Sequence, residues 1–158
     1  MSHISHRSGY SELVDRLNRF PQGAPPSETL YRILKILFSE REAELIALLP
    51  VKPFTAKQAA RAWKMKPAQA CAILDNLAGR ALLVDIECEG RTTYVLPPPM
   101  AGFFEFSMMR TRGDIDQHLL AELFYQYINV EEEFILSLFV NGETQIGRVF
   151  VQEPMLPS

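Results

Sequence analysis

The sequence from Thr55 to Val95, TAKQAARAWKMKPAQACAILDNLAGRALLVDIECEGRTTYV, decides the fold. A capping-box pattern at its start, Thr55-Ala56-Lys57-Gln58, predicts an alanine-rich helix that runs to about Trp63. After a short turn, Pro67 occupies the first position of a second helix, where its missing N–H costs no hydrogen bond. This second helix is predicted to end at Gly79, a residue suited to the left-handed conformation that often caps a helix.

A hairpin pattern follows the second helix. Leu82 to Glu87 alternates as a strand, Glu89-Gly90 supplies a turn, and Thr92 to Val95 returns as the second strand. Upstream, a further capping box at Ser39-Glu40-Arg41-Glu42 either restarts a helix or continues the one before it. Together these patterns predict a mainly α-helical chain with a small β-hairpin, organised as a winged helix-turn-helix plus additional helices.

The flanking segments divide the chain into three predicted regions. Residues 1–26 hold an N-terminal helix, from Ser8 to Phe20, and a linker. Residues 27–99 hold the winged helix-turn-helix domain, opened by a helix that Ser27 caps. Residues 100–158 form a C-terminal helical extension that ends in a strand and a linker.

The boundary after residue 99 rests on Pro97-Pro98-Pro99, since three prolines can continue neither a helix nor a strand. Beyond it, an Asp114-x-x-Gln117 pattern predicts the start of a helix. A further short helix is predicted to begin at Asn129 or at Glu131. An Asn-Gly turn then leads into a strand predicted from Gln145 to Val151.

Composition and charge exclude several classes of protein. The chain has 158 residues, of which 47% are hydrophobic and 22% charged, as in an ordinary globular protein with a packed core. Its net charge of −3 argues against a protein that coats nucleic acid non-specifically, because neutralising phosphates needs a surplus of Lys and Arg. No apolar run approaches the roughly 18 residues of a membrane span, so we expect a cytoplasmic protein without a membrane partner.

The sequence offers no starting point for catalysis or for a cofactor. It contains no Gly-x-Ser-x-Gly elbow and no His-Glu-x-x-His helix. Gly142 to Gly147 has the glycine spacing of a phosphate loop, but Arg148-Val149 replaces the Lys-Ser/Thr that would meet phosphate and magnesium. The two cysteines, Cys71 and Cys88, match no ligand motif and are expected to be small core or half-buried residues. We therefore expect no enzyme activity and no cofactor or metal in this chain.

The stretch from Met65 to Leu83 resembles the turn, recognition helix and first wing strand of MarR-type winged-helix regulators. The resemblance implies a helix that enters the major groove of DNA and touches base edges and phosphates. This sequence departs from that pattern because no Lys or Arg lies between Lys66 and Arg80. The candidate DNA-binding residues are therefore few: Lys64, Lys66, Gln69, Asn76, Arg80 and Arg91.

A second resemblance covers nearly the whole chain, including Ser11-Glu12-Leu13, the segment from Pro97 to Phe106, and the segment from Gly142 to Val149. It is similar to the N-terminal region of bacterial ferredoxin-type 4Fe-4S iron-sulfur binding proteins. The resemblance implies that 4Fe-4S clusters belong only to a cysteine-rich downstream region, and it assigns no cluster ligand to this chain. It also implies a protein partner or a downstream iron-sulfur domain.

An apolar cluster after the prolines is the candidate partner surface, and it consists of Phe103, Phe104, Phe106, Met108 and Met109. Five large apolar residues in seven exceed what one helix face usually buries in a small domain. They either pack in the core between the two halves of the chain or form a surface for a partner or a homodimer, where aromatics and Met are enriched.

Two functional hypotheses follow from the sequence. The first is a non-catalytic winged-helix module that serves protein interaction or regulation within a larger 4Fe-4S ferredoxin-type protein. The second is a DNA-binding transcriptional regulator of the MarR-like winged-helix type, acting as a dimer on a palindromic site.

Overall fold

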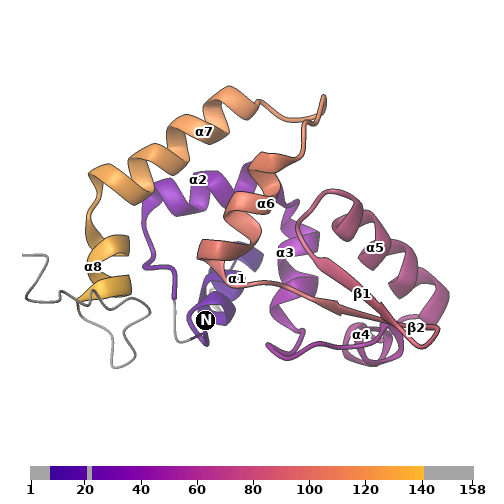
Figure 1. The fold of residues 1–158 in the computed structure, drawn as a ribbon. Helices are drawn as coiled ribbons and strands as arrows, with labels where there is room; N and C mark the ends of the chain where they lie inside the picture. Colours follow the sequence, from indigo (N-terminus) through magenta and orange to yellow (C-terminus); the bar gives the residue numbers. More distant parts are fainter. Residues whose placement is uncertain (1–7, 21–22, 141–158) are drawn as a thin grey trace, which may run out of the picture.

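The computed structural model of the chain describes residues 8–20 and 23–140. Within them the protein is mainly helical and carries one small two-stranded antiparallel hairpin, which confirms the predicted class at that level (Figure 1). The elements follow in this order: α1 (Gly9–Leu17), α2 (Glu28–Leu37), α3 (Glu40–Ala47), α4 (Ala56–Trp63), α5 (Pro67–Gly79), β1 (Val84–Cys88), β2 (Arg91–Val95), η1 (Pro99–Phe103), α6 (Phe104–Met109), α7 (Gln117–Tyr125), η2 (Gln126–Val130) and α8 (Glu133–Phe139).

Each of the first three helices begins after a serine cap. Ser8 and Ser27 each accept a backbone N–H of the first turn through their side-chain oxygens, which satisfies a donor that the helix itself leaves unpaired. Phe38 is extended, so the capping box of Ser39 and Glu42 restarts a helix rather than continuing α2. Helix α1 packs along α3, and α2 packs along α7 (Figure 1).

Helices α4 and α5 form a packed pair. The capping box of Thr55 and Gln58 is confirmed at the start of α4. Lys64 takes the left-handed conformation, with φ of 53°, and turns the chain toward Pro67, the first residue of α5. The indole Nε1 of Trp63 donates a hydrogen bond of 2.7 Å to the carbonyl oxygen of Leu45, which attaches α4 to α3.

The end of α5 differs from the prediction. Gly79 is the last helical residue, and Ala81 takes the left-handed conformation, with φ of 59°. The N–H of Leu82 bonds to the carbonyl of Leu77 at 3.0 Å and that of Ala81 to Ala78 at 2.8 Å, which is the hydrogen-bond pattern of a Schellman cap. Leu82 is fully buried, and packing it in the core fixes the chain reversal two residues after Gly79.

The hairpin pairs Val84 with Val95 and Cys88 with Arg91 at its two ends. Glu89 and Gly90 both have positive φ, at 51° and 71°, as expected of a tight two-residue turn that matches the twist of its strands. The residue before α4 also joins this sheet, because Phe54 and Tyr94 exchange backbone hydrogen bonds of 2.9 and 2.7 Å. The hairpin is thereby held against the start of α4.

Three details of the C-terminal part correct the sequence-based prediction. Pro99 begins the helical turn η1, because proline is tolerated at a first helical position where no N–H is needed. Asp116, and not Asp114, caps α7: its carboxylate accepts the N–H of Leu119 at 2.9 Å. Helix α8 begins at Glu133, later than predicted, because α7 continues into η2. The predicted turn at residues 141–142, strand at 145–151 and terminal linker lie outside the described residues.

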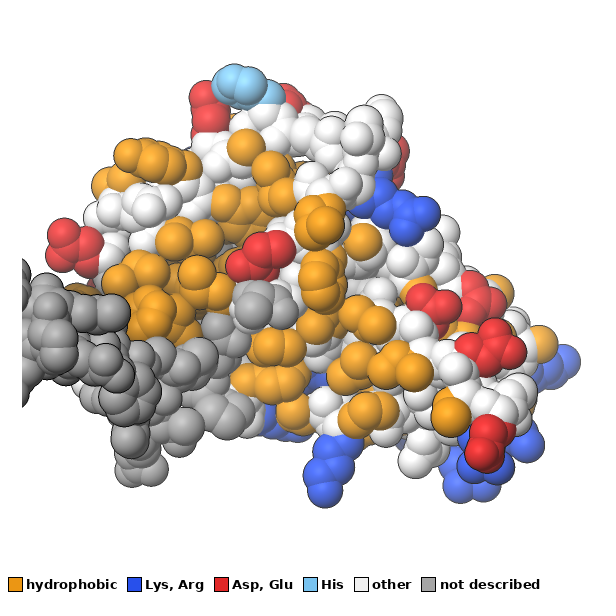
Figure 2. All heavy atoms as spheres, in the orientation of Figure 1, with side chains coloured by type: hydrophobic (Ala, Val, Ile, Leu, Met, Phe, Trp, Pro, Cys, Tyr) orange, Lys and Arg blue, Asp and Glu red, His pale blue; other side chains and the backbone are white. Residues whose placement is uncertain are grey.

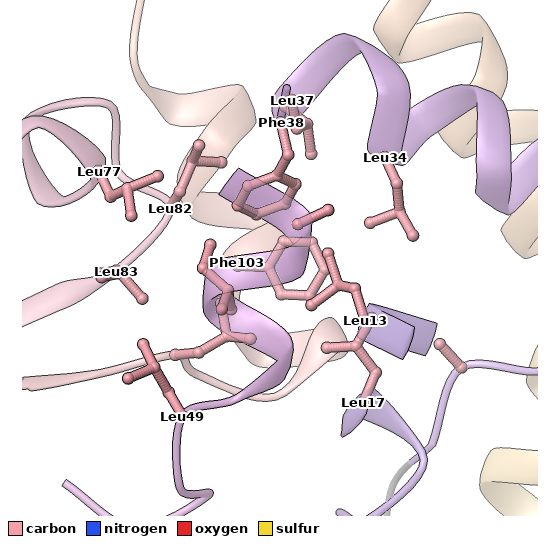
Figure 3. Packing of buried hydrophobic residues seen from close by; sticks show 14 of the residues in the cluster. Leu13, Leu17, Leu34, Leu37, Phe38, Leu49, Leu77, Leu82, Leu83 and Phe103 are labelled. Atoms are coloured by element: carbon pink, nitrogen blue, oxygen red, sulfur yellow. The ribbon is translucent and has the colours of Figure 1, made fainter. Parts of the chain in front are cut away.

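One cluster of buried residues forms the core and extends across both predicted region boundaries. It includes Leu13 and Leu17 of α1 as well as Phe103, which follows the prolines (Figure 3). The rings of Phe38 and Phe103 meet edge to face, with centroids 6.2 Å apart. The segment after residue 99 is therefore part of the same hydrophobic core as the helices before it.

Candidate functional site

The first candidate surface is formed by α5, the turn before it and the hairpin. Lys64, Lys66 and Asn76 are exposed there, as predicted from the sequence. Gln69 is exposed as well, but its side-chain Oε1 accepts the backbone N–H of Lys66 at 3.3 Å. Part of the hydrogen-bonding capacity of Gln69 is therefore used inside the protein, at the N-terminus of its own helix.

Arg80 does not belong to this exposed set. Its guanidinium is paired with the carboxylate of Glu42 on α3, and each side chain is only 21% exposed. Because a paired, half-buried guanidinium is a poor ligand for a phosphate, the pairing with Glu42 makes Arg80 a weaker candidate for DNA contact than the exposed residues. The pair attaches the end of α5 to the start of α3 and holds the helix in place.

Asp75 of α5 is attached to the hairpin. The hydroxyl of Tyr94 donates to Asp75 Oδ1 at 2.5 Å, and the thiol of Cys71 lies 3.5 Å from Asp75 Oδ2. Burial, together with the hydrogen bond to the Asp75 carboxylate, raises the pKa of Tyr94 far above its ordinary value. No sequence pattern predicted this cluster, because its members come from elements that meet only in the folded chain.

The remaining cations of this surface gather at one end of the molecule. Arg91 is exposed at the hairpin, and with Lys57 it borders a shallow hollow of about 480 Å³ between the hairpin turn and the start of α4. Figure 2 shows Lys and Arg side chains over this end of the fold, together with acidic side chains of the hairpin. The end is thus mixed in charge rather than uniformly basic.

Two cysteines, Cys71 of α5 and Cys88 of the hairpin, belong to this surface. Cys71 is half-buried, as expected, but Cys88 is exposed near the hairpin turn, so the prediction that it is half-buried is wrong. Among the residues that the structure describes, no group of three or more His, Cys, Asp or Glu side chains could hold a metal ion. The described residues therefore do not fit a 4Fe-4S cluster, which needs several thiolate ligands.

The second candidate surface follows the prolines, and two of its predicted members are not on the surface. Phe103 and Phe104 are 0% and 2% exposed. Their rings pack edge to face with centroids 4.7 Å apart, and the ring of Phe104 lies 4.8 Å from that of Phe124. Both residues are core residues, because α7 folds back over them and removes their rings from water.

The other three predicted members do reach the surface. Phe106 and Met109 are 36% and 80% exposed, and Met108 is half-buried. Figure 2 shows a broad area of hydrophobic side chains over α6 and α7. Isolated exposed apolar residues are ordinary in proteins, but a contiguous apolar area is typical of an interaction site.

A groove of about 480 Å³ lies in this area, between α6 and α7. Its lining is almost wholly apolar, and it consists of Phe104, Glu105, Met108, Met109, Ala121, Phe124 and Ile128. The sequence pointed to the α6 side of the groove but not to the α7 side. The α7 side consists of Ala121, Phe124 and Ile128, which are spaced three and four residues apart as on one face of a helix. This spacing predicts that the face is buried, but it does not predict which element packs against that face.

Comparison with known proteins finds no relative for this chain. No protein-family model matches it, and no curated protein or solved structure matches it significantly. Among the described residues, no helix combines the length and apolar character needed to cross a membrane. The geometry of the two surfaces is therefore the basis for a functional proposal.

Proposed function

We propose that α3, α4, α5 and the hairpin form a winged helix-turn-helix. The order of these elements supports the assignment, as does the turn at Lys64 between the two packed helices α4 and α5. The two backbone hydrogen bonds between Phe54 and Tyr94 also support the assignment, because they hold the hairpin beside the helices in the position of a wing. A winged helix serves different functions in different proteins, so its use must come from its surfaces.

The function we propose for the chain is non-catalytic protein interaction. The observation that carries the proposal is the apolar groove of about 480 Å³ between α6 and α7, with Met109 80% exposed at its side. Aromatic and Met side chains are enriched at the centres of protein interfaces, and methionine adapts its shape to a partner. Burying this groove against a protein segment would remove apolar surface from water, which favours association.

The resemblance to ferredoxin-type 4Fe-4S proteins supplies the setting of the proposal. In that setting the chain is the N-terminal interaction or regulatory module of a larger iron-sulfur protein in the cytoplasm. Its partner is then either the downstream iron-sulfur domain or another protein. The described cysteines take no part in holding a cluster under this proposal, and the groove provides the contact.

A peptide-binding measurement tests the proposal. The probe is an uncharged, fluorescein-labelled amphipathic peptide of about four helical turns, with leucines on one face and glutamines on the other. We expect its fluorescence anisotropy to rise on addition of the chain, and we expect Met109→Lys to weaken binding by about tenfold or more. Leu48→Lys is the control, because Leu48 is 59% exposed at the end of α3 and does not line the groove. The proposal fails if the two variants bind alike or if a scrambled peptide binds equally well.

A second candidate function is DNA binding as a MarR-like regulator, and the exposed cations around α4, α5 and the hairpin favour it. Lys64, Lys66 and Arg91 would contact phosphates, while Gln69 and Asn76 would face the bases. This function predicts that Lys66→Ala and Arg91→Ala lower affinity for every duplex, and that Gln69→Ala relaxes specificity at one base. Unchanged duplex binding in all three variants, with peptide binding retained, would leave only the first function.

A further inference from the structure

The groove between α6 and α7 lies in a strongly acidic part of the chain. From Pro99 to Val140 there are seven carboxylate side chains and two arginines, a net charge of −5. From Ala56 to Val95 there are six Lys and Arg against four Asp and Glu, a net charge of +2. The protein therefore separates its charges along its length, and the apolar groove belongs to the acidic end.

One acidic residue lines the groove itself, and others lie on the elements that form it. Glu105 lines it from α6, and its Oε2 accepts the backbone N–H of Gly102 at 3.0 Å, which fixes the carboxylate beside the apolar lining. Glu122 of α7, which is 64% exposed, lines a neighbouring hollow between α2 and α7. Glu131, which follows η2, lines that same hollow, so these carboxylates add negative charge beside the groove rather than in it.

The two arginines of this region offset these charges only in part. Arg112 is bonded to Asp114 through two hydrogen bonds of 2.8 and 2.5 Å, so this pair is neutral as a unit. Arg110 is exposed at the end of α6. Figure 2 shows an acidic side chain inside the hydrophobic area over α6 and α7, others at its edges, and basic side chains only beside it.

We propose that the occupant of this groove is a basic amphipathic helix of a protein partner. The inference rests on the proposed function and names the partner's chemistry. An apolar groove between two helices can bind a third helix, which inserts its side chains at positions i, i+3, i+4 and i+7. Lysines or arginines on the flanks of that helix would meet Glu105 and the negative charge around the groove, so charge would select the partner and speed its approach.

A second copy of the same surface is a poor occupant by comparison. In a two-fold dimer each patch faces itself, so Glu105 and the acidic surroundings of one groove would meet those of the other. Like charges at an interface disfavour association. The charge pattern therefore favours a basic partner over self-association through this groove.

Two charged forms of the amphipathic peptide test the inference. Both carry the same leucines, and the polar face carries lysines in one and glutamates in the other. We expect the full chain to bind the lysine peptide at least about tenfold more tightly than the glutamate peptide. We also expect affinity for the lysine peptide to fall as salt rises from about 50 to 200 mM, because salt screens exposed charges.

Charge variants of the chain assign the effect to the groove. Glu105→Gln keeps an acceptor for the N–H of Gly102 while removing the charge, and we expect it to weaken lysine-peptide binding about two- to fivefold. Glu87→Gln is the matched control, since Glu87 is exposed on the hairpin, and it should leave binding unchanged. The fluorescence of Trp63 reports that each variant is folded.

The possible results distinguish a failure of this inference from a failure of the proposed function. If the glutamate peptide binds as tightly as the lysine peptide, and Met109→Lys abolishes both, the groove binds protein without selecting charge and the inference is overturned. If the chain instead dimerises through the groove in sedimentation, with Met109→Lys restoring the monomer, a second copy is the occupant and the inference is also overturned. If no peptide binds, the proposed function fails with it.

Discussion

Gly9 lies where helices α1 and α3 come into close contact. A Cβ atom at this position would lie 2.7 Å from the carbonyl oxygen of Glu40 and 2.9 Å from the backbone nitrogen of Glu44. Backbone atoms cannot move aside as the end of a flexible side chain can. The absence of a side chain at Gly9 therefore allows the two helices to pack together.

Gly9→Ala should destabilise the protein by about 1–3 kcal/mol, the usual cost of overpacking a well-packed site. Gly79→Ala is the matched control, because nothing lies within 4 Å of a Cβ built there and Gly79 is helical. The control should stabilise the protein by roughly 0.5–1 kcal/mol, since alanine favours helix. Urea unfolding followed by circular dichroism measures both, and equal effects would contradict the close packing at Gly9.

Tyr127 gives the stability of the protein a dependence on alkaline pH. Its hydroxyl donates a hydrogen bond of 2.8 Å to the carbonyl oxygen of Pro25, and its ring is 1% exposed. Burial, and then the charges of Glu131 and Glu133, raise the pKa of Tyr127 above its ordinary value of 10. Above pH 10 the unfolded chain releases this proton while the folded chain retains it.

The native state therefore loses stability as the pH rises above about 10, and the contribution of Tyr127 is fully present below that value. Tyr127→Phe removes the ionisable group, so its urea midpoint should fall less than that of the wild type between about pH 9 and pH 11. At pH 7 the same variant should be less stable by about 1 kcal/mol, because the carbonyl of Pro25 loses a donor. Parallel pH curves for the two proteins would contradict the raised pKa.

At the scale of single elements, the start of helix α7 shows how a neighbouring ion pair decides which residue caps a helix. The sequence predicts Asp114 as the cap, and Asp116 lies two residues further on in the same loop. Arg112 binds the carboxylate of Asp114 and holds the pKa of that group below its ordinary value. Asp116 is then the residue whose carboxylate accepts the N–H of Leu119. This cap places the start of helix α7, which forms one wall of the groove, directly after Asp116.

Asp116→Ala should lower the free energy of unfolding by about 1 kcal/mol, the usual effect of losing a helix N-cap. Asp85→Ala is the control, because Asp85 is exposed on the hairpin and caps no helix. The control should change stability by less than about 0.5 kcal/mol. Thermal unfolding measures both, and an Asp116 variant as stable as the control would show that the cap contributes nothing.

At the scale of the whole molecule, Phe103 connects the segment after the prolines to the helices before it. It is fully buried between Phe38 of the first half and Phe104 of the second. A core that is continuous across residue 99 should unfold in a single cooperative transition, as most small domains do. This expectation of a single transition can be tested by substituting Phe103 and following the fluorescence of Trp63, the single tryptophan of the chain, which lies in α4.

Phe103→Ala should destabilise the protein by about 3–5 kcal/mol, the range for removing a buried aromatic ring. The loss should appear equally in the fluorescence of Trp63 and in the far-ultraviolet circular dichroism of all the helices. Coincident urea curves for the two signals, both displaced in the variant, are the expected result. If the urea unfolding curve measured by Trp63 fluorescence were the same in the variant and the wild type, the two halves would unfold independently.

The sequence by itself determined the local features of the fold. The caps at Ser27 and Thr55 follow from backbone chemistry within a few residues, as do the proline that opens α5 and the Glu89-Gly90 turn. Each of these signals is local, because the hydrogen bonds or backbone angles that it requires involve only neighbouring residues. For that reason they could be predicted without knowing what the elements pack against.

Only the tertiary structure decided which surfaces are available. It paired Arg80 with Glu42, buried Phe103 and Phe104, and used α7 to complete a groove whose other wall the sequence had indicated. It also buried Arg16 completely, with its guanidinium donating to the carbonyls of Leu49 and Pro50 at 3.0 and 2.6 Å. These outcomes depend on contacts between residues far apart in the chain, and burial and charge pairing are properties of those contacts rather than of the sequence around each residue.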